Sequence, residues 1–163
     1  MKHSEEHYKL YFGKKADYYL DVVKDFDSGK KVVFNIFSFF FGLFWMFYRK
    51  LYIPILVVAI LLFVEGMIEQ LILTIMNASV GTETFVDRIS MIVWGALLGL
   101  FGNRIYIRQA NRKIAKITAL NLSKEETNHR IKKAGGTTLI PHLIIVVIVG
   151  IIIILGQKGY FEY

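Results

Sequence analysis

Long apolar segments alternate with strongly polar segments along this chain. Three of the apolar segments cover 51–76, 89–106 and 139–156. Each can cross a bilayer as an α-helix, because a helix rises about 1.5 Å per residue and the hydrocarbon core is about 30 Å thick. The pattern therefore predicts an all-α membrane protein with three transmembrane helices.

A fourth apolar segment, 32–50, is shorter and rich in aromatic residues. Asn35 can cap a helix there, Ser38 interrupts the apolar run, and Arg49 and Lys50 close it. A helix of about 12–14 residues is too short to cross and suits the plane of the interface, with rings among the head groups and cations reaching water. We expect an amphipathic helix that lies in the interface or re-enters the membrane, and a fourth crossing is the alternative.

Two polar regions outside the spans also have helical patterning. In 1–31, apolar residues recur at helical spacing over 16–26, which predicts an N-terminal helix. In 107–138, the second span runs on into a basic helical region. There, Ser123 followed by Glu126 has the form of a capping box, which predicts the start of another short helix.

Positive charge is distributed very unevenly between the two sides of the predicted membrane. With three spans, 18 Lys and Arg residues fall on the side that holds 1–31 and 107–138. The loop 77–88 and the tail 157–163 hold the other 2, whereas a crossing by 32–50 changes the ratio to 11 to 9. Because Lys and Arg concentrate in the cytoplasm, we expect the N-terminus inside and the loop, the tail and the C-terminus outside.

The composition excludes a soluble enzyme. Hydrophobic residues make up 55% of the chain and the mean hydropathy is +0.46, whereas soluble domains are about 45–50% apolar. There is no Cys, and His3, Glu6 and His7 match a zinc pattern without an evident third ligand, which favours a solvated helix turn. We therefore expect no catalytic residue, no metal and no cofactor.

Two features inside the spans are candidates for contacts between helices. Glu65 and Glu69 lie one turn apart in the first span, and a carboxylate in hydrocarbon costs about 2.5–3.5 kcal/mol, so such residues face a bundle interior. They would relay protons or cations, or pack by hydrogen bonds across helices. Gly95 and Gly99 in the second span form a G-x-x-x-G pattern, which lets another helix, here most simply one of the same chain, approach closely.

A stripe of cations follows the second span. Arg104, Arg108, Arg112 and Lys116 recur every four residues and therefore share one helical face. With the pair at 49–50, they are candidates to bind anionic lipid, at about 1 kcal/mol per residue, or an acidic partner. The simpler alternative is that they only orient the chain. Nucleic acid is not an expected partner, because no motif that reads it occurs.

The order of two motifs resembles a known family. The aromatic segment contains FFFG at 39–42, Trp45 and YRK at 48–50, and GNR-x-Y follows at 102–106. Together these motifs resemble, over 11–138, a family of small bacterial membrane proteins of unknown function. The resemblance implies a protein of the bacterial cytoplasmic membrane and assigns no catalytic residue. Both motifs fall at the same predicted membrane boundary, where we expect them to meet.

The features together favour a non-catalytic role. We expect an integral membrane protein that serves as an interaction or accessory subunit and engages a partner or anionic lipid on the cytoplasmic side. The expected partners are the lipid bilayer and another membrane protein or a second copy of the chain. The alternative is a small transport or channel component that uses Glu65 and Glu69.

Overall fold

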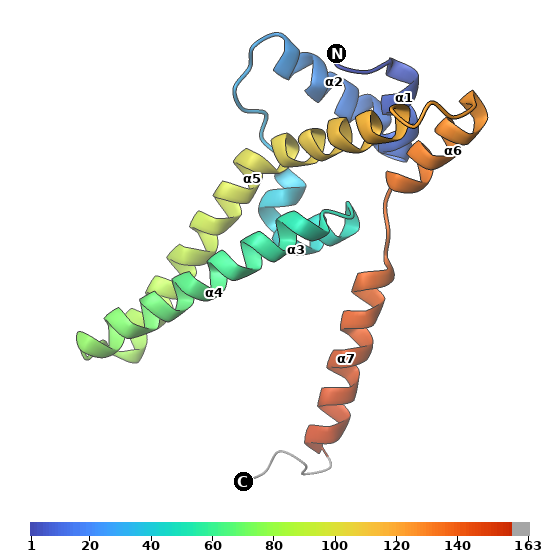
Figure 1. Ribbon diagram of the computed structural model, residues 1–163. Coiled ribbons are helices and arrows are strands. Elements are labelled where there is room, and N and C mark those ends of the chain that lie inside the picture. Colours follow the sequence, from blue (N-terminus) through green and yellow to red (C-terminus); the bar gives the residue numbers. More distant parts are fainter. Residues whose placement is uncertain (158–163) are drawn as a thin grey trace.

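The computed structural model describes residues 1–157 and is all-helical there, as the sequence predicts. The rest of the predicted tail 157–163 lies outside the described residues. A 3-10 turn, Gly13–Lys15, joins the first two helices. The α-helices are α1 (Glu5–Phe12), α2 (Ala16–Asp27), α3 (Ile36–Tyr48), α4 (Tyr52–Ile75), α5 (Val80–Thr118), α6 (Lys124–Ala134) and α7 (Ile140–Gln157) (Figure 1).

The molecule has a polar half and an apolar half. The polar half contains α1, α2, α6 and the C-terminal part of α5, which changes direction where it joins these helices (Figure 1). The apolar half contains α3, α4, α7 and the N-terminal part of α5, and it carries nearly all the exposed large apolar side chains. The largest fully buried apolar side chains lie mainly in the polar half: Tyr8, Tyr11, Phe12, Tyr19, Tyr106, Ile114 and Ile131.

Within residues 1–157, three helices are long and apolar enough to cross a membrane: α4, α5 and α7. Few residues in the apolar stretches of these helices are buried within the protein, and none in the apolar stretch of α7 is buried. Aliphatic side chains exposed all around a helix are the pattern expected where lipid or another membrane helix covers it. These helices make the chain a candidate membrane protein with three spans.

Helix α5 is longer than the sequence indicates. It begins at Val80 and α4 ends at Ile75, so the predicted loop 77–88 is replaced by a connection of four residues, 76–79. The helix starts there because the Ser79 side chain accepts a hydrogen bond from the Thr82 backbone N–H at 3.3 Å. At its other end α5 continues without a break to Thr118, which confirms that the second span runs on.

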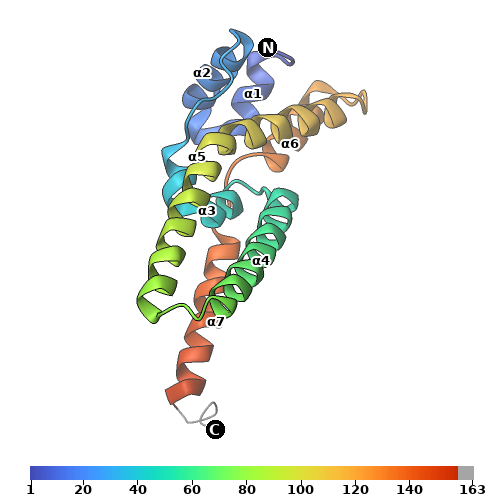
Figure 2. The same ribbon diagram turned by 90° about the vertical axis from the view of Figure 1, so that its left-hand side faces the viewer.

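Helix α3 is the central element of the apolar half. It contacts α4, α5 and α7, and it lies between α4 and α5 beneath the polar half (Figure 2). Asn35 caps its start, as predicted, by accepting the Ser38 backbone N–H at 2.9 Å. The helix is broken at Gly42, whose φ of 45° and ψ of −119° suit glycine. The expected single interfacial helix is therefore two short pieces with a kink between them.

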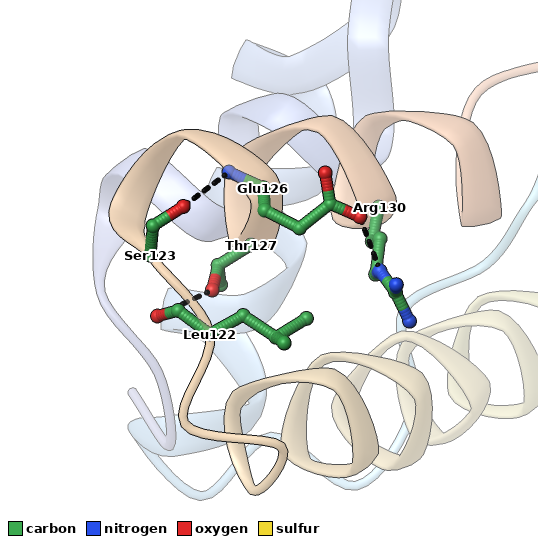
Figure 3. A network of polar contacts seen from close by, with 5 residues as sticks. All are labelled: Leu122, Ser123, Glu126, Thr127 and Arg130. Atoms are coloured by element: carbon green, nitrogen blue, oxygen red, sulfur yellow. Dashed lines mark hydrogen bonds and ion pairs between the residues drawn. The ribbon is translucent and has the colours of Figure 1, made fainter.

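Helix α6 begins where the sequence indicates. Ser123 accepts the Glu126 backbone N–H at 3.3 Å, which confirms the predicted cap (Figure 3). The reciprocal half of the capping box does not form, because the Glu126 carboxylate accepts from Arg130 Nε at 2.6 Å instead. After the helix, the Gly136 backbone N–H donates to the Tyr11 carbonyl at 2.7 Å, so α6 is fixed to α1.

Candidate functional site

The basic stripe of α5 forms one wall of a pocket in the polar half. Arg104, Arg108 and Arg112 line a cavity of about 530 Å³ between α5, α1 and the end of α2. We call this cavity the basic pocket. Lys116, the fourth member of the stripe, is exposed on α5 but does not line the pocket. The structure therefore brings three of the four predicted cations to one concave site and leaves the fourth outside it.

Further lining residues come from distant parts of the chain. Lys2 and Lys30 add cationic side chains, and Asp27 is the acidic side chain among the described lining residues. Tyr8 and Asn111 connect the walls, because the Tyr8 hydroxyl donates to Asn111 Oδ1 at 2.5 Å. Burial raises the pKa of Tyr8, so its hydroxyl keeps its proton at neutral pH and adds no negative charge to the pocket.

The electrostatics of the basic pocket favour an anion. Lys30 is paired with Asp25 at 2.8 Å, but within residues 1–157 no ion pair involves Arg104, Arg108 or Arg112. Like charges at i, i+4 on a helix repel by about 0.2–0.5 kcal/mol per pair. An anion bound among the three guanidinium groups removes this repulsion and accepts charge-assisted hydrogen bonds.

A buried polar network holds the pocket-bearing part of α5 against α3. The Asn35 amide donates to Asn103 Oδ1 at 2.8 Å, and Asn103 Nδ2 donates to the Tyr18 hydroxyl at 2.9 Å and the Val33 carbonyl at 3.1 Å. Asn35 and Asn103 are both fully buried. This contact joins the aromatic segment to the GNR-x-Y segment and confirms the expectation that they meet.

Arg49 does not reach water as the sequence predicts, because it is buried, whereas Lys50 is half-buried. The Arg49 side chain is only 5% exposed, and its guanidinium lies 4.7 Å from the centre of the Tyr19 ring and 5.3 Å from that of Tyr106. The Lys50 ammonium donates to the Gly135 carbonyl at 2.6 Å, beyond the C-terminus of α6. Arg49 is turned inward because α2 and α5 fold over the end of α3, so its predicted exposure to water is wrong, whereas Lys50 keeps part of its surface exposed.

The glycines of the second span pack against α3. A methyl group added at Gly95 would lie 3.1 Å from the Phe39 carbonyl oxygen, and one at Gly99 would lie 2.6 Å from the Phe34 ring. Gly102 continues the same face against Ser38. The helix that approaches these small residues is thus α3 of the same chain, and not another of the three long helices.

The two glutamates of α4 are half-buried and lie outside the basic pocket. Glu69 Oε2 accepts a hydrogen bond from the Ser90 hydroxyl of α5 at 2.7 Å. Glu65 lies one turn earlier on the same helix. The hydrogen bond between Glu69 and Ser90 connects α4 and α5 within the apolar half. Of the two alternatives for the glutamates, this bond corresponds to packing by hydrogen bonds across helices.

Sequence reasoning misses several residues that build the basic pocket. Lys2, Tyr8 and Lys30 belong to a region whose charges and aromatic rings are scattered, and no motif connects them to α5. The N-terminal region does contain many tyrosines, and such a density of aromatic rings indicates a packed polar half rather than a solvated tail.

Comparison with family models places this chain in a family. The chain belongs to the family described as protein of unknown function (DUF2628), whose model matches residues 10–112. The match runs from the end of α1 into the basic stripe of α5, so it includes Arg104, Arg108 and Arg112. Comparisons with curated proteins and with solved structures give no match.

Proposed function

We propose that this member of the family of unknown function is a non-catalytic interaction or accessory subunit of the bacterial cytoplasmic membrane, whose polar half binds an acidic group of a partner protein. The observation that carries the proposal is the basic pocket. Three arginines line it without an ion partner among residues 1–157, and a pocket with that charge is suited to a carboxylate or phosphate group.

The position of the basic pocket in the polar half favours an acidic group of a protein over the head group of a bilayer lipid. The described lining residues all come from α1, α2, α5 and the segments next to α1 and α2, and none from α3, α4 or α7. An anionic head group in the bilayer would be met beside the apolar helices. The acidic group therefore belongs to the polar part of another membrane protein or of a second copy of the chain.

The alternative of a transport or channel component has less support. Its candidate residues are Glu65 and Glu69, and a relay needs carboxylates that are free to exchange a proton or cation. Glu69 instead accepts the Ser90 hydroxyl across the helix interface, as expected of a residue that packs α4 on α5. We therefore keep the accessory role as the proposal.

We further propose that the polar half lies in the cytoplasm. Reporter fusions are expected to place residues 1–31 and 107–133 inside and the C-terminus outside, because the basic residues gather with α1, α2 and α6 at the end of the molecule opposite the end of α7 (Figure 1). The C-terminal residues lie outside the described part of the chain, so the fusion tests them directly. A cytoplasmic C-terminus would contradict this orientation, whereas residues 1–31 found outside together with the C-terminus would favour a fourth crossing by 32–50.

The basic pocket is tested with a deca-glutamate peptide and purified protein in a neutral detergent. At constant, low ionic strength, Arg108→Gln is expected to weaken peptide binding about tenfold, because a charge-assisted hydrogen bond contributes about 1.5–3 kcal/mol. Lys116→Gln is the matched control, since Lys116 belongs to the same stripe but lies outside the pocket. The peptide-binding constant of the Lys116→Gln variant is expected to stay within about twofold of that of the unsubstituted protein.

Two outcomes of that titration would contradict the proposal. Equal weakening by both variants would mean that the stripe acts as a diffuse charge and that the pocket has no part in binding. Binding that depends on Arg108 for phosphatidylglycerol vesicles but not for the peptide would show a lipid ligand in place of an acidic partner.

Added salt is expected to weaken peptide binding, because exposed cations are screened over about 10 Å at 0.1 M.

A further inference from the structure

A second pocket lies beside α3, between the polar and apolar halves, and has a different chemistry. Its volume is about 650 Å³, within the range of about 300–1,000 Å³ that ligand pockets occupy. Side chains of α2, α3 and the start of α7 surround it. We call it the aromatic pocket, and its principal residues are Tyr19, Phe37, Phe41, Phe44, Trp45 and Arg49.

Arg49 brings an unsatisfied cation to this pocket. Its guanidinium is enclosed by the rings of Tyr19, Tyr48 and Tyr106, at 4.7, 5.4 and 5.3 Å from the ring centres. Nε and Nη1 are buried and have no hydrogen-bond acceptor among the described residues. The faces of the aromatic rings attract the cation, but they do not accept a hydrogen bond from each of its N–H groups. A carboxylate or phosphate can accept two parallel hydrogen bonds from an arginine, so either group would satisfy these N–H groups.

The rest of the lining contains no counter-ion for Arg49. Lys15 adds a second cationic side chain, and no Asp or Glu is among the described lining residues. His142 of α7 donates from Nε2 to the Phe44 carbonyl at 3.0 Å, while its Nδ1 is buried and has no hydrogen-bond partner within residues 1–157. The polar groups of the pocket therefore carry net positive charge, and two of them have unused hydrogen-bonding capacity.

The other wall is apolar and open. Phe37, Phe41 and Phe44 of α3 line the pocket while each keeps half or more of its surface exposed. They stand beside the start of α7, one of the three helices able to cross a membrane. Aromatic surface in this position suits a hydrocarbon chain, because methylene groups packed against the ring faces gain many dispersion contacts.

We propose that the aromatic pocket binds one anionic amphiphile, with its carboxylate or phosphate on the Arg49 guanidinium and its hydrocarbon chain along Phe37 and Phe41. Two sources offer this chemistry: a free fatty acid, and an anionic phospholipid of the bilayer. The site is separate from the basic pocket in lining and in ligand. It therefore does not depend on the proposed interaction with a protein partner.

Trp45 provides a direct reporter, because it lines the pocket and is almost completely buried. Trp94→Phe leaves Trp45 as the single tryptophan of the chain. The full-length variant is placed in phosphatidylcholine vesicles, and bromine-labelled stearate or bromine-labelled phosphatidylglycerol is added. Bromine quenches tryptophan only at short range, so saturable quenching at a low mole fraction reports occupancy of the pocket. The methyl ester of the brominated stearate is the neutral control.

The expected result is saturable quenching by at least one anionic probe and about tenfold weaker quenching by the ester. Saturation by stearate alone identifies a fatty acid, and saturation by phosphatidylglycerol alone or by both identifies the phospholipid phosphate as a ligand. Arg49→Gln is expected to weaken the apparent affinity about tenfold, because the paired hydrogen bonds are lost.

A pair of neighbouring phenylalanines controls for the fold of the variants. Phe41 is 57% exposed and lines the pocket, whereas Phe40 is 69% exposed and does not. Phe41→Ala is expected to weaken binding about threefold, because packing contacts with the hydrocarbon chain are lost, and Phe40→Ala is expected to leave binding unchanged. Equal effects of the two, or equal quenching by the acid and its ester, would overturn the proposal. The comparison of Phe41→Ala with Phe40→Ala tests the proposed binding site even if Arg49→Gln fails to fold.

Discussion

Replacing Asn103 with leucine is expected to lower the free energy of unfolding by about 3 kcal/mol or more. The side chain is fully buried. It accepts a hydrogen bond from Asn35 and donates to the Tyr18 hydroxyl and the Val33 carbonyl. Leucine has a similar size, so the packing is largely kept while the buried amide of Asn35 loses its acceptor. An unsatisfied buried polar group costs about 1–3 kcal/mol, and chemical unfolding in mild detergent measures the sum.

A second asparagine of α5 is the matched control. Asn111 is half-buried, and its side chain accepts one hydrogen bond from Tyr8. Asn111→Leu is expected to cost less, about 1–2 kcal/mol, because only one side-chain hydrogen bond is lost. The double variant of Asn35→Ala with Asn103→Leu is expected to cost less than the sum of the two single variants, since each alone strands the other amide. Strict additivity would contradict the network.

Gly102→Ala is expected to separate α3 from α5 and to destabilise the protein by about 2 kcal/mol. A methyl group there would lie 2.5 Å from Ser38 Oγ and 2.8 Å from Ser38 Cβ. Because Ser38 Cβ is attached directly to the backbone of α3, rotation of a side chain cannot relieve the clash. The midpoint of thermal unfolding in mild detergent is the measurement, and it is expected to fall.

Gly66→Ala on α4 separates this steric effect from helix propensity. Nothing lies within 4 Å of a methyl group at Gly66, so the substitution meets open space. Alanine is favoured over glycine within a helix by about 1 kcal/mol, and the thermal midpoint is therefore expected to stay or rise. A fall as large as that of Gly102→Ala would mean that glycine is needed in these helices for some reason other than the α3 contact.

The helices themselves were predictable because their signals are local. Long apolar runs indicate α4 and α7, and the caps Asn35 and Ser123 mark the starts of α3 and α6. The start of α5 was missed, since Glu83 and Asp87 lower the hydropathy of its first turns. Hydropathy identifies the apolar part of a helix and not its ends.

The candidate site was predictable only in part. Periodicity alone places Arg104, Arg108 and Arg112 on one face of a helix. It does not show that α1 and α2 cover that face and turn it into a pocket, or that Lys116 stays outside. The same limit applies to Arg49, whose place after a row of aromatic residues is typical of a surface cation at a membrane boundary.

The sequence by itself determined the number of apolar helices, the helical nature of the polar regions and the uneven distribution of charge, because each depends on neighbours within about 20 residues. Tertiary structure alone decided that Arg49 is buried and that the basic stripe lines a cavity. The contacts responsible join residues far apart: 68 positions separate Asn35 from Asn103, and 103 separate Tyr8 from Asn111. Such contacts depend on how side chains of different helices fit together in space, and no local pattern in the chain encodes that fit.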